Sequence, residues 1–475
     1  MWIVLGLLAL FLVVIVLRAA CFRPKKQPCV PYQETTFDRQ APIDALQKLV
    51  QCKTISYSDH TKEDDAEFKK MINLLPHLYP RVFDVCSFQE LPDRALLFRW
   101  PGKADDGPTV LMAHYDVVPV DEAQWTRPPF DGLIEDGHLW GRGTLDTKAT
   151  FNGILSAADH LISKGFQPAQ DIWFAFSGGE EVNGPGADNI VDYFLQHGIQ
   201  PALVVDEGGA VVENVFPGVK KPCGLIGIAE KGMMNVQYTV RSSGGHASAP
   251  KPGGPVGTLA RACVRLEKKP FKMRLSSPAR AMFDRLGRHS SFGYRLIFAN
   301  LWCFGWAIDL LGRLSGGEIN ALVRTTVAFT QMEGSSARNV IPPEARLVSN
   351  MRLAPGDTVR SALGYLRKTV DDDRVEITAL ESFEPSRISQ VDCPAWDKVS
   401  AAVSATWPGC IVSPYLMVQC SDSRHYGRIS DHVYRFSAMD MTAQERASIH
   451  GNDEKIRLES INKAVEFYIR LILTC

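Results

Sequence analysis

The stretch VLMAHYDVVPV, residues 110–120, is apolar enough to form a buried strand, yet it carries His114 and Asp116. Titratable side chains are disfavoured in a buried strand unless another group pairs with them. Residues two apart on a strand point to the same face, so both side chains would meet the same surroundings. The stretch therefore predicts a core strand with a polar site at its end.

Strand-like and helix-like segments alternate around this stretch. The strand-like runs cover 109–118, 171–179 and 201–209, and the helix-like runs cover 41–52, 149–165 and 189–198. Strands that alternate with helices of this length indicate an α/β layer with a largely parallel sheet. In such a sheet the strand ends form one crevice, where binding and catalytic sites are built.

The pattern changes in the middle of the chain, where segments alternate like half-exposed antiparallel strands. We expect the α/β layer over 41–234, an inserted α+β unit over 235–375, and the α/β layer again over 376–475. The predicted fold class is therefore α/β: a discontinuous domain with a largely parallel mixed sheet flanked by helices, plus a smaller inserted α+β domain of the lid or dimerisation type.

A hydrophobic insertion is expected inside the smaller unit, near 270–320. Its core, FGYRLIFANLWCFGWAIDLLGRL (292–314), could be buried, contact a partner or touch a membrane surface. Arg295 and Asp309 argue against a simple second membrane span, so core or interface packing is the simplest interpretation.

The N-terminal segment is apolar and uncharged from Trp2 to Leu17 and is followed by basic residues. These sixteen residues would rise ~24 Å as a helix, and a snorkelling Arg18 would extend the span toward Phe22. A cleaved signal peptide normally has a basic residue before its apolar run, and none precedes this one. We expect residues 1–22 to be an uncleaved transmembrane anchor, or a signal sequence of a secreted protein if it is cleaved, and 23–40 to be a linker.

Composition narrows the function classes. The chain has 475 residues, too many for one ordinary core, and a formal net charge of −1, which gives no reason to expect nucleic-acid binding. Basic residues after the apolar run favour a cytoplasmic location for that side. The eleven scattered cysteines fit a reducing compartment, but cysteines packed in a core would look the same. The side of the membrane is left open.

Acidic and histidine side chains collect beside the turns that follow the predicted strands. They are His114, Asp116, Asp146, Glu180, Glu181 and Asp206. Each is common by itself, since adjacent glutamates usually lie on a solvated face and an aspartate before glycine can cap a turn. Carboxylates brought together repel one another unless a cation neutralises them. Histidine with carboxylates suits Zn²⁺, with Co²⁺ and Mn²⁺ as alternatives.

These motifs resemble, in the same order, those of the two-metal aminoacylase and carboxypeptidase metallopeptidases. That family includes acetylornithine deacetylase, carboxypeptidase G and succinyl-diaminopimelate desuccinylase. The matching motifs are HYD (114–116), GRGTLDTK (141–148), EE (180–181), DEGG (206–209) and IHGNDEKI (449–456). The resemblance extends from about residue 40 to the C-terminus. The insertion and the apolar N-terminus are most similar to the carboxypeptidase S branch, which includes N-acyl-amino-acid hydrolases.

The resemblance implies a site for two divalent metal ions, with zinc favoured. The implied ligands are His114 and Asp206 for one ion, Glu181 and His450 for the other, and Asp146 as the bridge between them. Asp116 would orient His114 through its other ring nitrogen. Glu180 would be the general base, which activates water and passes the proton to the leaving nitrogen.

Three further positions match family residues that handle substrate. His246, in SSGGHASAP, matches a histidine that stabilises the oxyanion and that in dimeric relatives reaches the neighbouring subunit's site. Asn339 and Arg352 match positions that bind the substrate's carboxylate or oxyanion, a role that suits the planar fork of arginine. A turn histidine and two surface strand residues are the alternative interpretations. A homodimer is one consequence of the resemblance.

The sequence also departs from the family pattern. Gly179 precedes the glutamate pair where many relatives have a polar residue, and Gln419 and Cys420 replace glycines beside the substrate. Substrate preferences therefore need not transfer. His425 and His432 lie near that loop, and we interpret both as structural.

We expect a membrane-anchored, metal-dependent amide hydrolase that acts on a small molecule with a free carboxylate. It would remove a C-terminal amino acid from a small peptide or hydrolyse an N-acyl amino acid, and the apolar stretch 292–314 could favour lipid-like acyl chains. Closure between the two units would bring His246 toward the metals. The alternatives are a deacylase or desuccinylase for one metabolite, and a catalytically idle membrane-anchored binding protein, which the complete ligand set and Glu180 disfavour.

Overall fold

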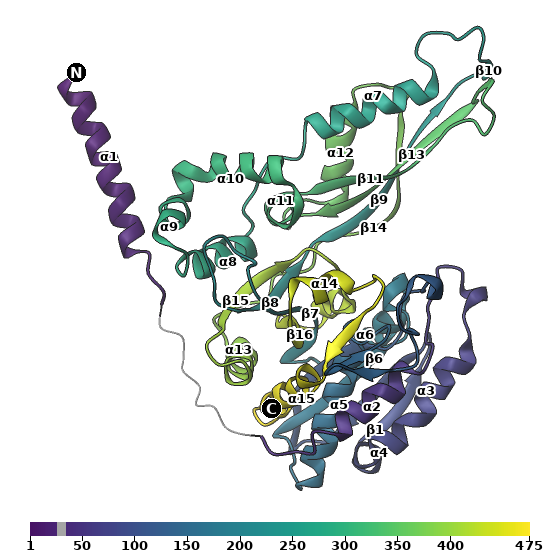
Figure 1. The fold of residues 1–475 in the computed structure, drawn as a ribbon, viewed down its shortest axis with the longest axis vertical. Coiled ribbons are helices and arrows are strands. Elements are labelled where there is room, and N and C mark those ends of the chain that lie inside the picture. The colour runs from purple at the N-terminus through teal and green to yellow at the C-terminus, as the bar shows by residue number, and fades with distance from the viewer. Residues whose placement is uncertain (26–34) are drawn as a thin grey trace.

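The computed structural model describes residues 1–25 and 35–475; residues 26–34, within the linker expected over 23–40, lie outside the described residues. One unit is built on an eight-stranded mixed sheet and a smaller one on a four-stranded antiparallel sheet, and a separate helix projects from the side (Figure 1). The predicted fold class, α/β with a smaller inserted α+β unit, is confirmed.

The large sheet has the strand order β1-β2-β6-β3-β7-β16-β8-β15. Its strands are β1 (Ser87–Leu91), β2 (Ala95–Trp100), β3 (Ala104–His114), β6 (Gln170–Ser177), β7 (Leu203–Val212), β8 (Cys223–Glu230), β15 (Ile411–Met417) and β16 (Val433–Met441). The central strands β6, β3, β7 and β16 run parallel, whereas β1 and β2 are antiparallel at one edge. The parallel centre places the carboxyl ends of β6, β3 and β7 at one edge of the sheet.

Helices cover both faces of the large sheet, which explains why its central strands are continuously apolar. On β3, Leu111 and Ala113 belong to one core with α5 (Lys148–Ser163) and α15 (Leu458–Ile472), while Val110 and Met112 belong to another with α6 (Gly186–Gln196). The other helices of this unit are α2 (Ala41–Val50), α3 (Asp65–Leu78), α4 (Pro80–Val85), α13 (Pro394–Thr406) and α14 (Ala443–Ser448). A small sheet beside it contains β4 (Ile134–Glu135), β5 (His138–Trp140) and β17 (Lys455–Arg457).

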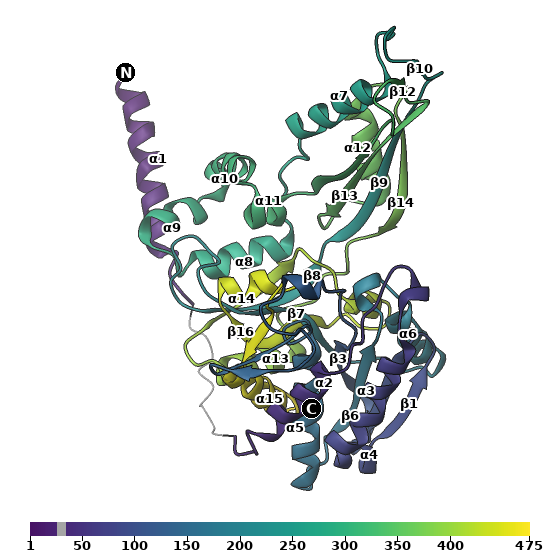
Figure 2. The same cartoon turned by 45° about the vertical axis from the view of Figure 1, so that its right-hand side comes forward.

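The smaller unit has the strand order β11-β13-β9-β14 and is covered by α7 (Pro255–Lys268) and α12 (Val359–Val370) (Figure 2). Its strands are β9 (Gly232–Arg241), β11 (Thr326–Glu333), β13 (Glu344–Leu353) and β14 (Glu376–Phe383). Because β14 pairs with β9, residues 376–383 lie in the small sheet rather than in the resumed α/β layer. The expected boundary at residue 375 therefore falls one strand too early.

The hydrophobic insertion forms α8 (Ser277–Gly287), α9 (Phe292–Phe298), α10 (Leu301–Ser315) and α11 (Gly317–Val323). It does not pack as part of the four-stranded unit. Met282 and Phe283 of α8 share a core with Leu225 and Ile411 of the large sheet. The apolar residues of α8 recur on one helical face, and the large sheet is the surface that buries them.

The N-terminal helix α1 (Trp2–Cys21) is long and apolar enough to cross a membrane. Most of its large apolar side chains are exposed, and it contacts α9. The helix is compatible with a membrane anchor or with a signal sequence.

Candidate metal centre

The centre is built at the carboxyl ends of the parallel strands. His114 is the last residue of β3 and pairs in register with Ser177, the last residue of β6. Glu180 and Glu181 follow within one short helical turn, Glu180–Val182. Gly178 permits this turn because a Cβ at that position would lie 2.6 Å from the ring of Tyr115.

Asp146 lies between two histidines, and each of its oxygens contacts one of them. Its Oδ1 is 2.9 Å from Nε2 of His114, and its Oδ2 is 3.1 Å from Nε2 of His450. The same nitrogen of His450 is 3.0 Å from Oε2 of Glu181, and that of His114 is 3.5 Å from Oε1 of Glu207. Two histidine–glutamate pairs, His114 with Glu207 and His450 with Glu181, are therefore joined by Asp146.

Glu207 takes the place in this cluster where the sequence predicted Asp206. Successive residues of a strand point to opposite faces, so only one of the two can face His114. The carboxylate of Asp206 instead accepts a hydrogen bond from the backbone N–H of Ser423 at 3.0 Å. The motif DEGG carries two adjacent acids, and choosing between them required the direction of each side chain.

Asp116 holds two parts of the centre together. Its backbone oxygen lies 3.0 Å from Nδ1 of His114, closer than its carboxylate at 3.4 Å. The carboxylate accepts hydrogen bonds from the hydroxyl of Ser56 (2.6 Å) and from the backbone N–H groups of Glu180 (3.1 Å) and Glu181 (3.2 Å). Asp116 therefore positions the glutamate turn as well as the histidine.

Glu454 is a positioning residue that the sequence analysis missed. It is fully buried, accepts a 2.6 Å bond from Nη1 of Arg142 and accepts a 2.7 Å bond from the backbone N–H of Leu145. These contacts join the loop that carries Asp146 to the loop that carries His450. The charged residues of GRGTLDTK and IHGNDEKI could have indicated the pair, since a buried charge requires a partner.

The centre carries more negative charge than its own residues neutralise. Burial and the nearby Asp146 raise the pKa of Glu181 to about 7 and that of Glu207 to about 8. Burial, with the neighbouring carboxylates, raises the pKa of Glu180 well above its ordinary value. Oε1 of Glu181 is buried with no hydrogen-bond partner among the described residues. These features fit a cation-binding site.

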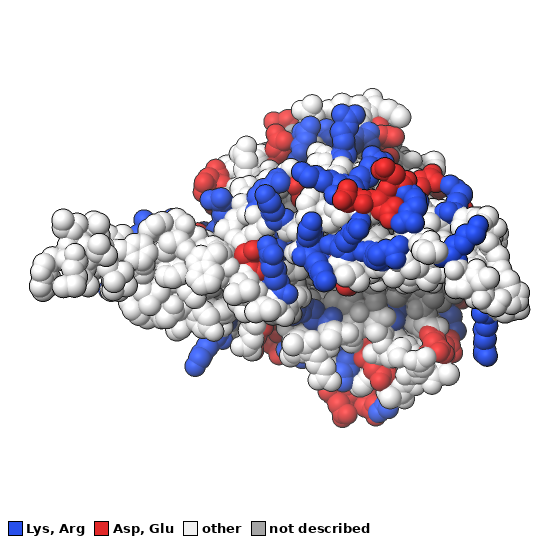
Figure 3. All heavy atoms as spheres, turned by 90° about the horizontal axis from the view of Figure 1, so that it is seen from above, with Lys and Arg blue, Asp and Glu red and all other residues white. Residues whose placement is uncertain are grey.

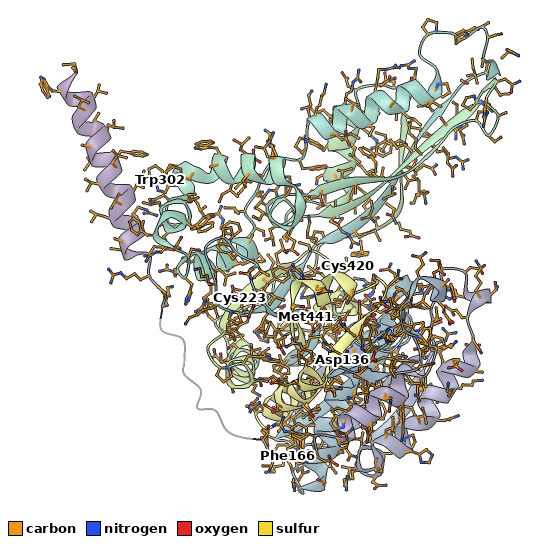
Figure 4. The ribbon with its side chains drawn as sticks, in the orientation of Figure 1. Asp136, Phe166, Cys223, Trp302, Cys420 and Met441 are labelled. Atoms are coloured by element: carbon orange, nitrogen blue, oxygen red, sulfur yellow. The ribbon has the colours of Figure 1, made fainter. Side chains whose placement is uncertain are left out.

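Arg352, on β13, faces the large unit from the smaller one. Its Nη1 lies 2.8 Å from Sγ of Cys420, and Figure 4 shows Cys420 between the two units. The thiol of Cys420 in turn donates to the carbonyl of Lys231 at 3.6 Å. Of the three predicted substrate residues, Arg352 is the one that the structure brings into contact with the large unit.

His246 and Asn339 lie together, but not at the metal centre. His246 is on β10 (Gly245–His246), which pairs with β12 (Val340–Ile341). Asn339 precedes β12, and its carbonyl accepts a 2.9 Å bond from the backbone N–H of Ala247. Both side chains are exposed. Their hairpins form the tip of the smaller unit, at the end far from the large sheet (Figures 1 and 2).

The two histidines predicted to be structural, His425 and His432, contact groups outside the cluster. Nδ1 of His425 is 3.2 Å from Asp188, and Nδ1 of His432 is 3.1 Å from the carbonyl of Ala202. These contacts suit the structural roles that we expected for them.

Solved structures with this fold include a metallo-carboxypeptidase of the M20 family from Sulfolobus solfataricus. It has a TM-score of 0.68 and 17% identity, covering 91% of this chain and 98% of that chain. A dinuclear metal-binding peptidase of the same family from Bacillus subtilis has a TM-score of 0.57 and 12% identity, covering 92% and 97%. At these identities the likeness shows the fold alone.

Sequence relatives support the branch expected from the motifs. A probable carboxypeptidase S-like protein from Dictyostelium discoideum is 33% identical over 98% of this chain and 91% of its own length. The N-fatty-acyl-amino acid synthase/hydrolase PM20D1 of Xenopus tropicalis is 34% identical over 92% of this chain and 86% of its own length. The model of peptidase family M20/M25/M40 matches residues 110–474. The chain therefore belongs to the M20/M25/M40 family of peptidases.

Proposed function

We propose that this chain hydrolyses amide bonds with the help of two divalent metal ions, either removing the C-terminal amino acid of a small peptide or cleaving an N-acyl amino acid. One observation carries the proposal: Asp146 uses both oxygens to join two histidine–glutamate pairs. The names of the relatives, a carboxypeptidase S-like protein and an N-fatty-acyl-amino acid synthase/hydrolase, support these two substrate classes.

The residues of the centre fit such a metal pair. His114 and Glu207 would hold one ion, His450 and Glu181 the other, and Asp146 would bridge them. Ligand atoms that share one ion at ~2.1 Å lie roughly 3–4 Å apart, as the contacting atoms here do. Histidine with carboxylates favours Zn²⁺, and Mn²⁺ or Co²⁺ would fit the same set. Lewis acidity toward water and the amide carbonyl is the chemistry that the bound ions supply.

Glu180 would move the proton. Its carboxylate lies in one group with His114 and Glu207, close to where water must attack. As general base it would take a proton from water and deliver it to the leaving nitrogen. Asp116, through its bonds to the backbone of the glutamate turn, would hold this carboxylate in place.

Arg352 would bind the free carboxylate of the substrate. A guanidinium group can donate two parallel hydrogen bonds to a carboxylate, and Arg352 lies on the side of the smaller unit that faces Cys420. Cys420 stands where the family pattern has a glycine, so we expect the substrate preference beside Arg352 to differ from that of relatives.

His246 and Asn339 would act on the site of a second copy. Within one chain they lie at the far tip of the smaller unit (Figure 1), so a dimer would have to supply them in trans. Mixing Glu180→Gln protein with His246→Ala protein tests this, after dissociation and reassociation of the subunits. Restored activity in the mixture supports sharing between copies; two inactive variants that fail to complement would contradict it.

We also propose that α1 is an uncleaved membrane anchor. Its apolar length supports a span, and Arg18 in its last turn and Arg23 just after it would lie at the membrane surface.

A substrate panel tests the activity. Full-length protein in detergent would be stripped with chelator, loaded with Zn²⁺, Mn²⁺ or Co²⁺, and assayed on dipeptides and on acyl amino acids with acetyl to long-chain acyl groups. Turnover that requires metal is expected across several substrates. Turnover of one acylated metabolite alone would favour a specific deacylase, and no turnover by metal-loaded protein would favour an idle binding protein.

A further inference from the structure

We propose that α9 and α10 dock on the bilayer surface beside α1, so that lipid covers the apolar face of α10. The inference rests on the proposed anchoring by α1 and extends it, because it gives the enzyme a second membrane contact and a fixed orientation on the bilayer.

The first argument is that α1 is fastened to the junction of α9 and α10. Nη2 of Arg18 donates to the carbonyl of Ala299 at 3.0 Å, and Nε of Arg18 donates to Oδ1 of Asn300 at 3.1 Å. Nδ2 of Asn300 returns a bond to the carbonyl of Ile15 at 3.1 Å. The α9–α10 junction must therefore lie at the depth where α1 leaves the membrane.

The second argument concerns depth. The ring of Trp302, in the first turn of α10, packs edge-on against Phe11 of α1 with centroids 5.9 Å apart. Phe11 precedes Arg18 by seven residues, or ~10 Å along a helix. If Arg18 reaches for the aqueous interface, Trp302 lies on the lipid side of it.

The third argument is the surface that α10 leaves exposed. Trp302, Trp306, Leu310 and Leu314 recur every four residues and are 61%, 67%, 47% and 78% exposed. They form one stripe along the helix. A stripe of large apolar side chains is unfavourable in water, whereas tryptophan is enriched at the membrane interface. Behind the stripe, Tyr294 and Leu311 line an apolar pocket, which continues the apolar surface inward.

The bend between α9 and α10 favours docking on the bilayer surface over crossing the bilayer. The two helices together are apolar enough for a span but bend by 104° at their junction. Asp309 on α10 is ion-paired with Arg313 at 2.9 Å, and such a pair suits a helix that lies in the interface plane.

Charge on the neighbouring surface fits the same orientation. α7 lies along the same upper side of the molecule as α10 in Figure 1. It carries the exposed basic residues Arg261 and Lys268, and the exposed Lys269 follows directly after it. Figure 3 shows Lys and Arg side chains gathered on this upper face, with the mostly apolar α1 extending to one side. Basic side chains near a bilayer attract anionic headgroups.

Photocrosslinking of the full chain in vesicles of phosphatidylcholine and phosphatidylglycerol tests the proposal. The photoreactive residue p-benzoylphenylalanine would be placed at Trp306 or at Leu314, and at Leu195 as the control. Leu195 is 48% exposed, on α6 of the large unit. Lipid adducts, detected by mass spectrometry, are expected at the two α10 positions and not at the control.

Carbonate extraction separates this proposal from the anchoring of α1. A chain that resists extraction but gives no adducts at Trp306 or Leu314 would overturn docking and leave the anchor intact. Adducts equal in yield at Leu195 would also overturn it. A chain that is extracted yet gives adducts at α10 before extraction would support docking and contradict the anchor.

Discussion

The residues of the metal centre and of the tip of the smaller unit were predicted from the same set of motifs. In the structure the first group is in contact, whereas the second lies apart from it. The centre gathers His114, Asp146, Glu181 and His450 from separate segments of one chain into contact. The tip holds His246 exposed and far from them (Figure 1). Residues at the strand ends of one sheet are placed by the fold itself, whereas residues on an inserted unit depend on the position of that unit or of a second copy.

The largest effect is expected at Glu180, the proposed proton carrier of the centre. Glu180→Gln should lower kcat by about 10²–10⁴-fold, because the amide cannot accept the proton, while the metal content stays unchanged. Glu90→Gln, on the edge strand β1, is the matched control. Steady-state kinetics and metal analysis check this. Full activity in Glu180→Gln would exclude its role as the base.

The buried pair that supports the centre should matter far more than an exposed pair of the same kind. Glu454→Ala leaves Arg142 buried without its carboxylate, a loss of about 3–5 kcal/mol in the free energy of unfolding. Glu376→Ala removes the exposed partner of Arg241 in the smaller unit and should leave the melting temperature nearly unchanged. Chemical denaturation compares the two. Similar losses for both variants would show that the Glu454 contacts do not fasten the centre.

Arg352 tests the side of the smaller unit that contacts the large unit, where we propose that the substrate's carboxylate binds. Arg352→Ala should raise KM for carboxylate-bearing substrates by about 10–100-fold, the loss of charge-assisted hydrogen bonds, with less effect on kcat. Arg346→Ala, an exposed position on the same strand, should change neither. The discriminating measurement is the ratio of KM for a substrate and for its carboxamide; a ratio unchanged by Arg352→Ala would remove the proposed contact.

Lys231, at the connection between the two units, should make the free energy of unfolding depend on pH. Burial lowers the pKa of Lys231, which lies between β8 and β9, to about 7 from about 10.5. The unfolded chain thus binds this proton more tightly than the folded chain does. The free energy of unfolding therefore rises with pH above 7 and falls as the pH drops toward 7. Between pH 7 and 9 the gain from this group is about 2 kcal/mol. Unfolding curves of Lys231→Met should lack this gain; an identical pH slope in both proteins would contradict it.

Much of the fold was predictable because its signals are local. The apolar run before His114 and the glycines after Glu181 follow from burial and turn chemistry. The contact of His114 with Glu207 rather than with Asp206 was not predictable, since it depends on which face each side chain meets. The pairing of Glu454 with Arg142 joins residues that only the folded chain brings together. The position of β14 was also not predicted, because alternating polar and apolar residues indicate a strand but not the sheet that it joins.

Metal content of two neighbouring variants tests the central claim most directly. Protein purified, loaded with Zn²⁺ and desalted would be measured by mass spectrometry of the native chain and by elemental analysis. We predict two ions per chain in the wild type and in Asp206→Asn, and loss of one ion in Glu207→Gln, because Glu207 faces His114 and Asp206 faces Ser423. Two ions retained in Glu207→Gln with one lost in Asp206→Asn would contradict the proposed centre.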